Sequence, residues 1–298
     1  MKKLLITGAS GFLGWNLCRA TQDRWNVYGL ARRSRNQLQG IKYLNADLTL
    51  FSEIKQNLLE IRPEALIHTA AESGPNFCQL NPRASYRINV EAAVNLASFC
   101  ADVGIPFVFI SSDLVFDGLH PPYCEKDAVS PISIYGEQKA EAERAILERY
   151  PGALVCRTAL MFGDAGPEAA GFIQPLITGM KNGSRINLFT DEYRTPVSGV
   201  NAAQGIMLAL SKTNGILHLG GMERISRFDF GKLLQKVLGA HNANLFPCTR
   251  QNITMPAPRP ADVSLDSSRA MALGFNPGSL REELEKLACV REFMDLRD

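Results

Sequence analysis

The chain has 298 residues and a mass of 32.8 kDa, enough to bury a large core as one α/β unit or as two interleaved domains. Hydrophobic residues make up 46% and charged residues 21%, as in ordinary globular proteins, which argues against disorder. The formal net charge is +2 and no block of lysines and arginines is present, so we expect no nucleic-acid partner.

The first residues, MKKLLIT, form an apolar run that breaks at Gly8, before it reaches the length of a signal peptide. No stretch approaches the roughly 18 apolar residues needed to cross a bilayer, so we expect no membrane association. The seven cysteines are scattered without a C-x-x-C pair, which is typical of reduced thiols rather than of metal ligands. We therefore expect a cytoplasmic protein without a bound metal.

Short apolar strands alternate with amphipathic segments in the first half of the chain. We expect strands at 3–7, 26–31, 65–70, 107–111 and 153–157, and helices at 12–23, 51–61, 82–103 and 131–150. This alternation indicates parallel βαβ units, and strands that are almost entirely apolar indicate a sheet covered on both faces. The sequence therefore predicts an α/β fold with a Rossmann-type doubly wound parallel sheet.

The pattern is looser in the second half of the chain. We expect helices at 200–212, 228–239 and 280–295, a strand at 215–221, and a loop-like stretch at 248–266. Ligands of open α/β proteins lie beyond the carboxyl ends of the strands, where a second domain would close the cleft. We expect a dinucleotide-binding domain over 1–160, to which 197–212 returns, and a smaller, interleaved substrate-binding domain over 161–298.

A glycine-rich turn directly follows the first expected strand and opens a helix. Gly8, Gly11 and Gly14 permit positive φ and let the backbone approach a pyrophosphate, which amide N–H groups and the positive helix end can hold. The alternative is a helix start that merely packs tightly. The context between strand and helix favours a dinucleotide site.

Tyr135 and Lys139 are four residues apart on an expected helix and so share one face. A neighbouring ammonium stabilises phenolate and lowers a tyrosine pKa that is otherwise about 10, so that tyrosine becomes a usable proton donor. Ser112, directly after the strand expected at 107–111, can hydrogen-bond a substrate carbonyl oxygen. Each residue alone also fits an ordinary structural role, as a surface pair or a turn serine.

Two further segments bear on the cofactor. Arg32 and Arg33 follow the second strand, where NAD-preferring sites carry an acid, and guanidinium groups suit a 2′-phosphate. We therefore expect NADP in preference to NAD, although both arginines could be ordinary solvated charges. Asp47 and Leu48 could hold the adenine, or Asp47 could be the N-cap of the next helix.

Four motifs together, GASGFLG, HTAA, SSDLVFDG and YGEQK, resemble those of extended short-chain dehydrogenases/reductases. The resemblance implies that Tyr135 is the catalytic acid/base and that Lys139 binds the nicotinamide ribose and lowers the tyrosine pKa. It also implies that Ser112, rather than Ser111, orients the substrate. The residues it places along the cofactor are Gly8, Gly11, Phe12, Leu13 and Gly14 at the pyrophosphate, and Ala70 and Ala71 at the end of the strand expected at 65–70.

The second half narrows the resemblance to the dTDP-4-dehydrorhamnose reductase branch, through DEYRTPVSGVNAA at 191–203 and PAPRPADVSLDSSRAMALGF at 256–275. Members of that branch reduce a 4-keto group of a deoxysugar nucleotide with NAD(P)H. Arg194 and Arg259 are candidates for the substrate diphosphate, because a planar guanidinium matches phosphate bidentately, although either could form a surface salt bridge. The substrate expected is thus a nucleotide sugar, and a homodimer is possible.

Two alternatives remain open. A nucleotide-sugar epimerase uses the same Ser/Tyr/Lys set. A non-enzymatic NADP-binding regulatory subunit, like the beta subunit of methionine adenosyltransferase, resembles the same reductase branch. A 4,6-dehydratase is disfavoured, because Ser112 is followed by Asp113 and then Leu114, without the second acid of those enzymes.

Overall fold

The fold centres on a seven-stranded parallel sheet. A computed structural model describes residues 1–33 and 38–295. The strands lie in the order β11-β6-β5-β4-β1-β2-β3, and all adjacent pairs are parallel. Their bounds are Lys3–Thr7 (β1), Asn26–Ala31 (β2), Lys42–Asn45 (β3), Ala65–His68 (β4), Phe107–Ser112 (β5), Leu154–Thr158 (β6) and Gly215–Leu219 (β11). The strand order reverses between β1 and β4, and a crevice for ligand forms at such a point.

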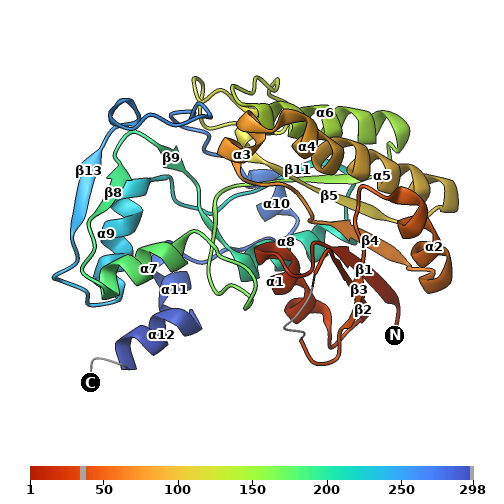
Figure 1. The fold of residues 1–298 in the computed structure, drawn as a ribbon, viewed down its shortest axis with the longest axis horizontal. Coiled ribbons are helices and arrows are strands. Elements are labelled where there is room, and N and C mark those ends of the chain that lie inside the picture. The colour runs from red at the N-terminus through yellow and green to blue at the C-terminus, as the bar shows by residue number, and fades with distance from the viewer. Residues whose placement is uncertain (34–37, 296–298) are drawn as a thin grey trace.

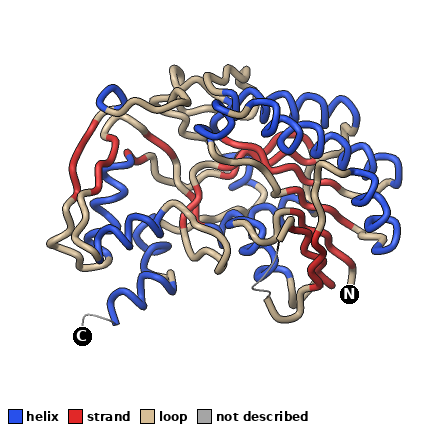
Figure 2. Tube along the Cα trace, in the orientation of Figure 1, coloured by secondary structure: helices blue, strands red, loops and turns tan. Residues whose placement is uncertain are grey.

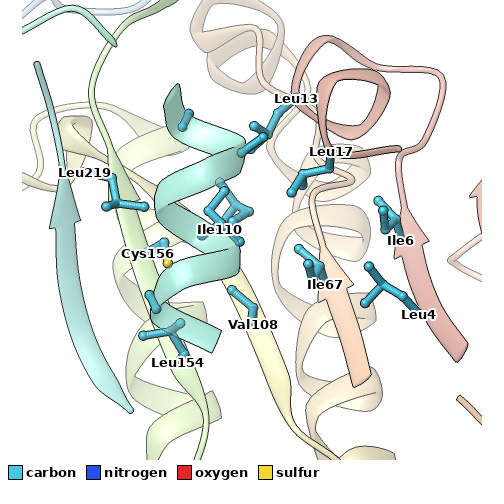
Figure 3. Close-up of a cluster of buried hydrophobic side chains, with 14 of the residues drawn as sticks. Leu4, Ile6, Leu13, Leu17, Ile67, Val108, Ile110, Leu154, Cys156 and Leu219 are labelled. Atoms are coloured by element: carbon cyan, nitrogen blue, oxygen red, sulfur yellow. The ribbon is translucent and has the colours of Figure 1, made fainter. Parts of the chain in front are cut away.

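Helices cover both faces of the sheet (Figures 1 and 2). On one face lie α1 (Phe12–Thr21) and α8 (Gly199–Leu210), whose apolar residues join those of the strands in one hydrophobic cluster. Figure 3 shows Leu13 and Leu17 of α1 beside Ile67 of β4 and Leu4 and Ile6 of β1. On the other face lie α2 (Phe51–Ile61), α5 (Ala92–Val103) and α6 (Ile134–Arg149). The Rossmann-type doubly wound sheet is confirmed.

A separate hydrophobic cluster lies at the other end of the molecule, on the left of Figure 1. It is built from α7 (Ile173–Lys181), α9 (Arg227–Val237), α11 (Leu280–Glu285), α12 (Ala288–Asp295) and the parallel pair β8 (Ile186–Phe189) and β13 (Leu245–Cys248). The shorter elements are α3 (Pro75–Leu80), α4 (Pro82–Tyr86), α10 (Ser268–Ala272), β7 (Met161–Phe162), β9 (Tyr193–Arg194), β10 (Val197–Ser198) and β12 (Ile225–Ser226). No helix in the described part of the chain is both long and apolar enough to cross a membrane.

Two expected helices are interrupted in the structure. The helix expected at 82–103 is divided into α4, a π-helical turn at Arg87–Glu91, and α5. The helix expected at 280–295 is broken, because the Asp164 carboxylate accepts the N–H groups of Ala288 and Cys289 and so caps α12 as a new helix. The segment that returns to the main sheet also extends beyond the expected 197–212, because β11 (Gly215–Leu219) pairs with β6.

The packing of α8 on the sheet can be tested with Ile206→Ala. Ile206 is fully buried in the cluster on that face, so we expect the free energy of unfolding to fall by about 2–5 kcal/mol. Val200→Ala on the same helix removes a side chain that is 44% exposed, and we expect a change within about 0.5 kcal/mol. Urea unfolding of both variants measures the difference. Equal losses would contradict the burial of this helix face.

Candidate active site

A cavity of about 750 Å³ lies beyond the carboxyl ends of the strands, where the strand order reverses between β1 and β4. It brings together nearly all of the site residues expected from the sequence. Those that line it are Gly8, Gly11, Phe12, Leu13, Gly14, Arg32, Asp47, Leu48, Ala70, Ala71, Ser112, Tyr135, Lys139, Arg194 and Arg259. Arg33, expected beside Arg32, is exposed and does not line the cavity.

The glycine turn brings three pieces of backbone into contact. Gly8 has φ of +68°, and a Cβ there would lie 2.7 Å from the backbone nitrogen of Ala70. The amide of Gly11 donates to the carbonyl of Gly8 (2.9 Å), and a Cβ at Gly14 would lie 2.1 Å from the same carbonyl oxygen. The turn therefore leaves an open cradle at the start of α1, with free helix N–H groups beside it. This cradle fits a pyrophosphate.

The far end of the cavity is lined by residues that follow β2 and β3. Asp47 accepts hydrogen bonds from the backbone and the hydroxyl of Thr49 (2.9 and 2.8 Å), and these bonds lower the pKa of its carboxyl. The N-cap of α2 is Leu50 rather than Asp47, so the expected capping role is wrong. Asp47 and Leu48 both line the cavity and are free to contact an adenosine.

Ser112 ends β5 and turns its hydroxyl into the same cavity. Its Oγ donates to Asp113 (3.0 Å) and accepts from the backbone N–H of Leu114 (3.1 Å), which caps a short 3₁₀ turn. Ser111 also lines the cavity, and its hydroxyl has no partner among the described residues. The local turn thus fixes the orientation of Ser112.

Tyr135 and Lys139 lie on the first two turns of α6, which begins at Ile134 after the N-cap Ser133, three residues later than expected. Both are buried, with 7% and 3% of their surface exposed. The ammonium donates to the carbonyl of Ile110 (2.8 Å) and lies 4.5 Å from the ring centroid of Phe109 and 5.9 Å from that of Tyr135. The helix therefore directs both groups at the end of β5.

Burial has the largest effect on the pKa values of Tyr135 and Lys139. It raises the pKa of Tyr135, as does the nearby Asp113 carboxylate, and a hydrogen bond with Ser112 acts in the opposite direction. Burial also lowers the pKa of Lys139 to about 8. The lowered tyrosine pKa expected from the sequence is therefore not seen, because burial and the Asp113 carboxylate both raise it. The phenol holds its proton at neutral pH, as a proton donor must.

Beyond Ser112 and Tyr135 lies a buried cluster of charges. Arg194 lies 3.5 Å from Asp113 and 3.3 Å from Glu192, and Arg227 lies 2.8 Å from Glu192. Arg259 lines the same wall, and its Nε has no partner among the described residues, like one Nη of Arg227. These arginines are therefore not surface salt bridges, and three guanidinium groups face two carboxylates in this part of the cavity.

Comparison with known proteins shows the family of this chain. Its sequence matches the RmlD substrate binding domain family over residues 1–292. The chain belongs to this family. It is 29% identical over 284 residues to methionine adenosyltransferase 2 subunit beta of Bos taurus, which covers 92% of this chain and 83% of that protein.

Two solved structures of related proteins extend the match. A hypothetical dTDP-4-dehydrorhamnose reductase from Sulfolobus tokodaii is 32% identical, with a TM-score of 0.80 and coverage of 91% of this chain and 94% of that one. The dTDP-4-dehydrorhamnose reductase of Bacillus anthracis, in complex with NADP, is 26% identical, with a TM-score of 0.87 and coverage of 96% and 99%. The resemblance to this branch of the extended short-chain dehydrogenases/reductases is confirmed.

Sequence reasoning missed several residues of this RmlD-family site. Arg227 was placed just outside its helix, yet it is the first residue of α9 and lines the cavity. A cation in the first turn of a helix opposes the helix dipole, and this anomaly could have marked it. Arg87 and Ile88 also line the cavity, from the π-helical turn. Such turns often mark functional sites. Among the described residues, no group of three or more His, Cys, Asp or Glu side chains could hold a metal ion.

The cradle at the turn can be tested with Gly14→Ala. The new Cβ would meet the Gly8 carbonyl at 2.1 Å, so the turn must open, and we expect the affinity for NADPH to fall about tenfold or more. Gly74→Ala is the matched control, because its Cβ would meet no atom closer than 3.4 Å. Calorimetric titration with NADPH measures both. Unchanged affinity in Gly14→Ala would exclude the cradle as the cofactor site.

Proposed function

We propose that the protein is an NAD(P)H-dependent reductase of a 4-keto deoxysugar nucleotide. The observation that carries the proposal is the convergence of Ser112, Tyr135 and Lys139 on the cavity that the glycine turn also lines. A pyrophosphate cradle at one wall and a buried proton donor at another suit hydride and proton transfer to one carbonyl group. Membership of a family with dTDP-4-dehydrorhamnose reductases supports this substrate class.

The side chains present supply the proton chemistry. A bound nicotinamide would supply the hydride that reduces the carbonyl carbon. Tyr135 would donate its proton to the carbonyl oxygen, and Ser112 would hydrogen-bond the same oxygen as negative charge develops there. Lys139 would hold the nicotinamide ribose and stabilise the phenolate that remains. The raised pKa of Tyr135 suits this direction of reaction, because it keeps the donor protonated before transfer.

We predict that Tyr135→Phe lowers turnover at least about a hundredfold, the usual scale of general acid catalysis. Tyr86→Phe is the matched control, since the Tyr86 hydroxyl bonds Glu141 outside the cavity. The measurement is cofactor oxidation by absorbance with a panel of 4-keto nucleotide sugars. Full turnover in Tyr135→Phe would remove this residue from the mechanism.

NADP is the cofactor we propose as preferred, on the strength of Arg32. This residue lines the cavity on the same side as Asp47, and its guanidinium suits a 2′-phosphate. The relative whose structure was solved with NADP supports a nicotinamide cofactor.

Arg32 and Arg33 provide a matched pair of substitutions that tests the preference for NADP over NAD. Arg32→Ala should reduce the ratio of NADP to NAD affinity about tenfold or more, whereas Arg33→Ala should leave it close to that of the wild type, because Arg33 does not line the cavity. Calorimetric titration of each variant with NADP⁺ and NAD⁺ measures the ratio. Equal effects of the two substitutions would refute the assignment of Arg32 to the 2′-phosphate.

We propose that Arg194 and Arg259 contact the substrate diphosphate, with Arg227 beside them. All three line the cavity on the side of Ser112 and Tyr135, and one nitrogen each of Arg227 and Arg259 is buried there without a partner among the described residues. Buried guanidinium nitrogens that lack a hydrogen-bond partner favour an anionic ligand. The separate hydrophobic cluster that includes α7 and α9 would then support the substrate side of the cleft.

A non-enzymatic cofactor-binding subunit is the second candidate. The 29% identity to methionine adenosyltransferase 2 subunit beta over 92% of the chain favours it. The same panel of sugars separates the two: NADPH binding without turnover of any sugar would favour the subunit. An epimerase remains the other enzymatic alternative, and it would interconvert sugars without net oxidation of the cofactor.

A further inference from the structure

Helix α6 carries a buried carboxylate, Glu143, one turn beyond Lys139. Residues four apart on a helix lie on the same face, so this carboxylate shares the face of the ammonium. Arg157 of β6 donates to both of its oxygens, from Nε (3.0 and 3.2 Å) and from Nη2 (2.7 Å). The side chains of Glu143 and Arg157 are 4% and 3% exposed. The ion pair therefore fixes the Glu143 carboxylate in one orientation inside the protein.

A neutral histidine lies on the other side of Arg157. Nδ1 of His218 lies 3.1 Å from the carbonyl of Tyr123, which can only accept, so this nitrogen carries the proton. Nε2 is then free to accept from Nη1 of Arg157 at 3.4 Å. Burial lowers the pKa of His218 to about 4, so it adds no charge at neutral pH. The Glu125 carboxylate accepts the backbone N–H of His218 (3.0 Å), but among the described residues Glu143 is the carboxylate that forms an ion pair with Arg157.

The groups that face Lys139 come from four elements. Tyr135 and Glu143 lie on α6, Cys78 on α3 and His68 on β4, and the Ile110 carbonyl of β5 accepts from the ammonium. Burial raises the pKa of Cys78 and lowers that of His68 to about 3, so both are uncharged at neutral pH, as is Tyr135. Among these described groups, Glu143 thus carries the negative charge that opposes the desolvation of Lys139.

We propose that Glu143 is a positioning residue for Lys139: its carboxylate, held by Arg157, keeps the buried ammonium charged in the cofactor site. The inference rests on the proposed function only in assigning Lys139 to the nicotinamide ribose. A charged ammonium that donates to the Ile110 carbonyl still has hydrogens left for the ribose hydroxyls, whereas a neutral amine is a weaker donor. Loss of the Glu143 charge would therefore weaken cofactor binding at a lower pH than in the wild type.

The test is the affinity for NADPH, measured by calorimetric titration from pH 6.5 to 10 without any sugar. In the wild type we expect affinity to fall as pH rises through about 8, where Lys139 loses its proton. In Glu143→Gln the midpoint should move down by about one pH unit, because the charged form loses its carboxylate and faces an uncompensated Arg157. Glu148→Gln, on the exposed part of the same helix, should keep the wild-type midpoint.

Two further variants keep the test decisive if Glu143→Gln fails to fold. Glu143→Gln/Arg157→Met removes both charges together, and its midpoint should lie between those of the wild type and the single variant. Glu143→Asp keeps the charge and should stay near the wild type. A wild-type midpoint in Glu143→Gln, or in the double variant where only that one folds, overturns the proposal. Absence of turnover with every sugar would count against the reductase and leave this titration intact.

Discussion

The close approach of backbone at the β1–α1 turn is the constraint on which the site depends. The Gly8 carbonyl lies so near Gly14 that a side chain at Gly14 has no room, and Gly8 itself is pressed against the backbone at Ala70. These contacts bring the start of α1 down onto the carboxyl ends of β1 and β4. A helix N-terminus with free N–H groups thus faces the point where the strand order reverses, which is where a dinucleotide can lie across the sheet.

The opposite wall of the cavity is formed by side chains from β5, β6 and α6. Parallel strands end side by side, so Ser112 of β5 and Thr158 of β6 are neighbours in register, and α6 crosses over them with Tyr135 and Lys139 directed inward. One wall therefore exposes the backbone of the glycine turn, which suits a phosphate, and the other carries the buried side chains of Tyr135 and Lys139, which suit proton transfer. The arginines beyond them add a third wall with the chemistry of an anion site.

Features that depend on local sequence were predicted well. The strand and glycine turn at 3–14, and the shared face of Tyr135 and Lys139, follow from spacing within a few residues. Features set by distant residues were not. Asp164 caps a helix more than a hundred residues away, and the tyrosine pKa depends on burial and on Asp113 rather than on Lys139 alone. Arg32 lines the cavity and Arg33 does not, because the chain leaves β2 at Ala31 and bends at Arg32, and a bend of this kind is not visible in the sequence.

The buried charges along α6 are hard to explain by stability. Two ions taken out of water lose several kcal/mol of hydration each, and replacing a buried pair by apolar side chains is often neutral or stabilising. An Arg157–Glu143 pair that only joined α6 to β6 would thus gain little over a well-packed hydrophobic contact. Glu143 lies one turn beyond Lys139, however, and there its negative charge has a functional role. A nearby anion helps an ammonium buried next to Phe109 to stay protonated. The ion pair then acts on the cofactor site by keeping Lys139 of the same helix charged. This charged ammonium is the benefit that offsets the desolvation cost of the buried pair.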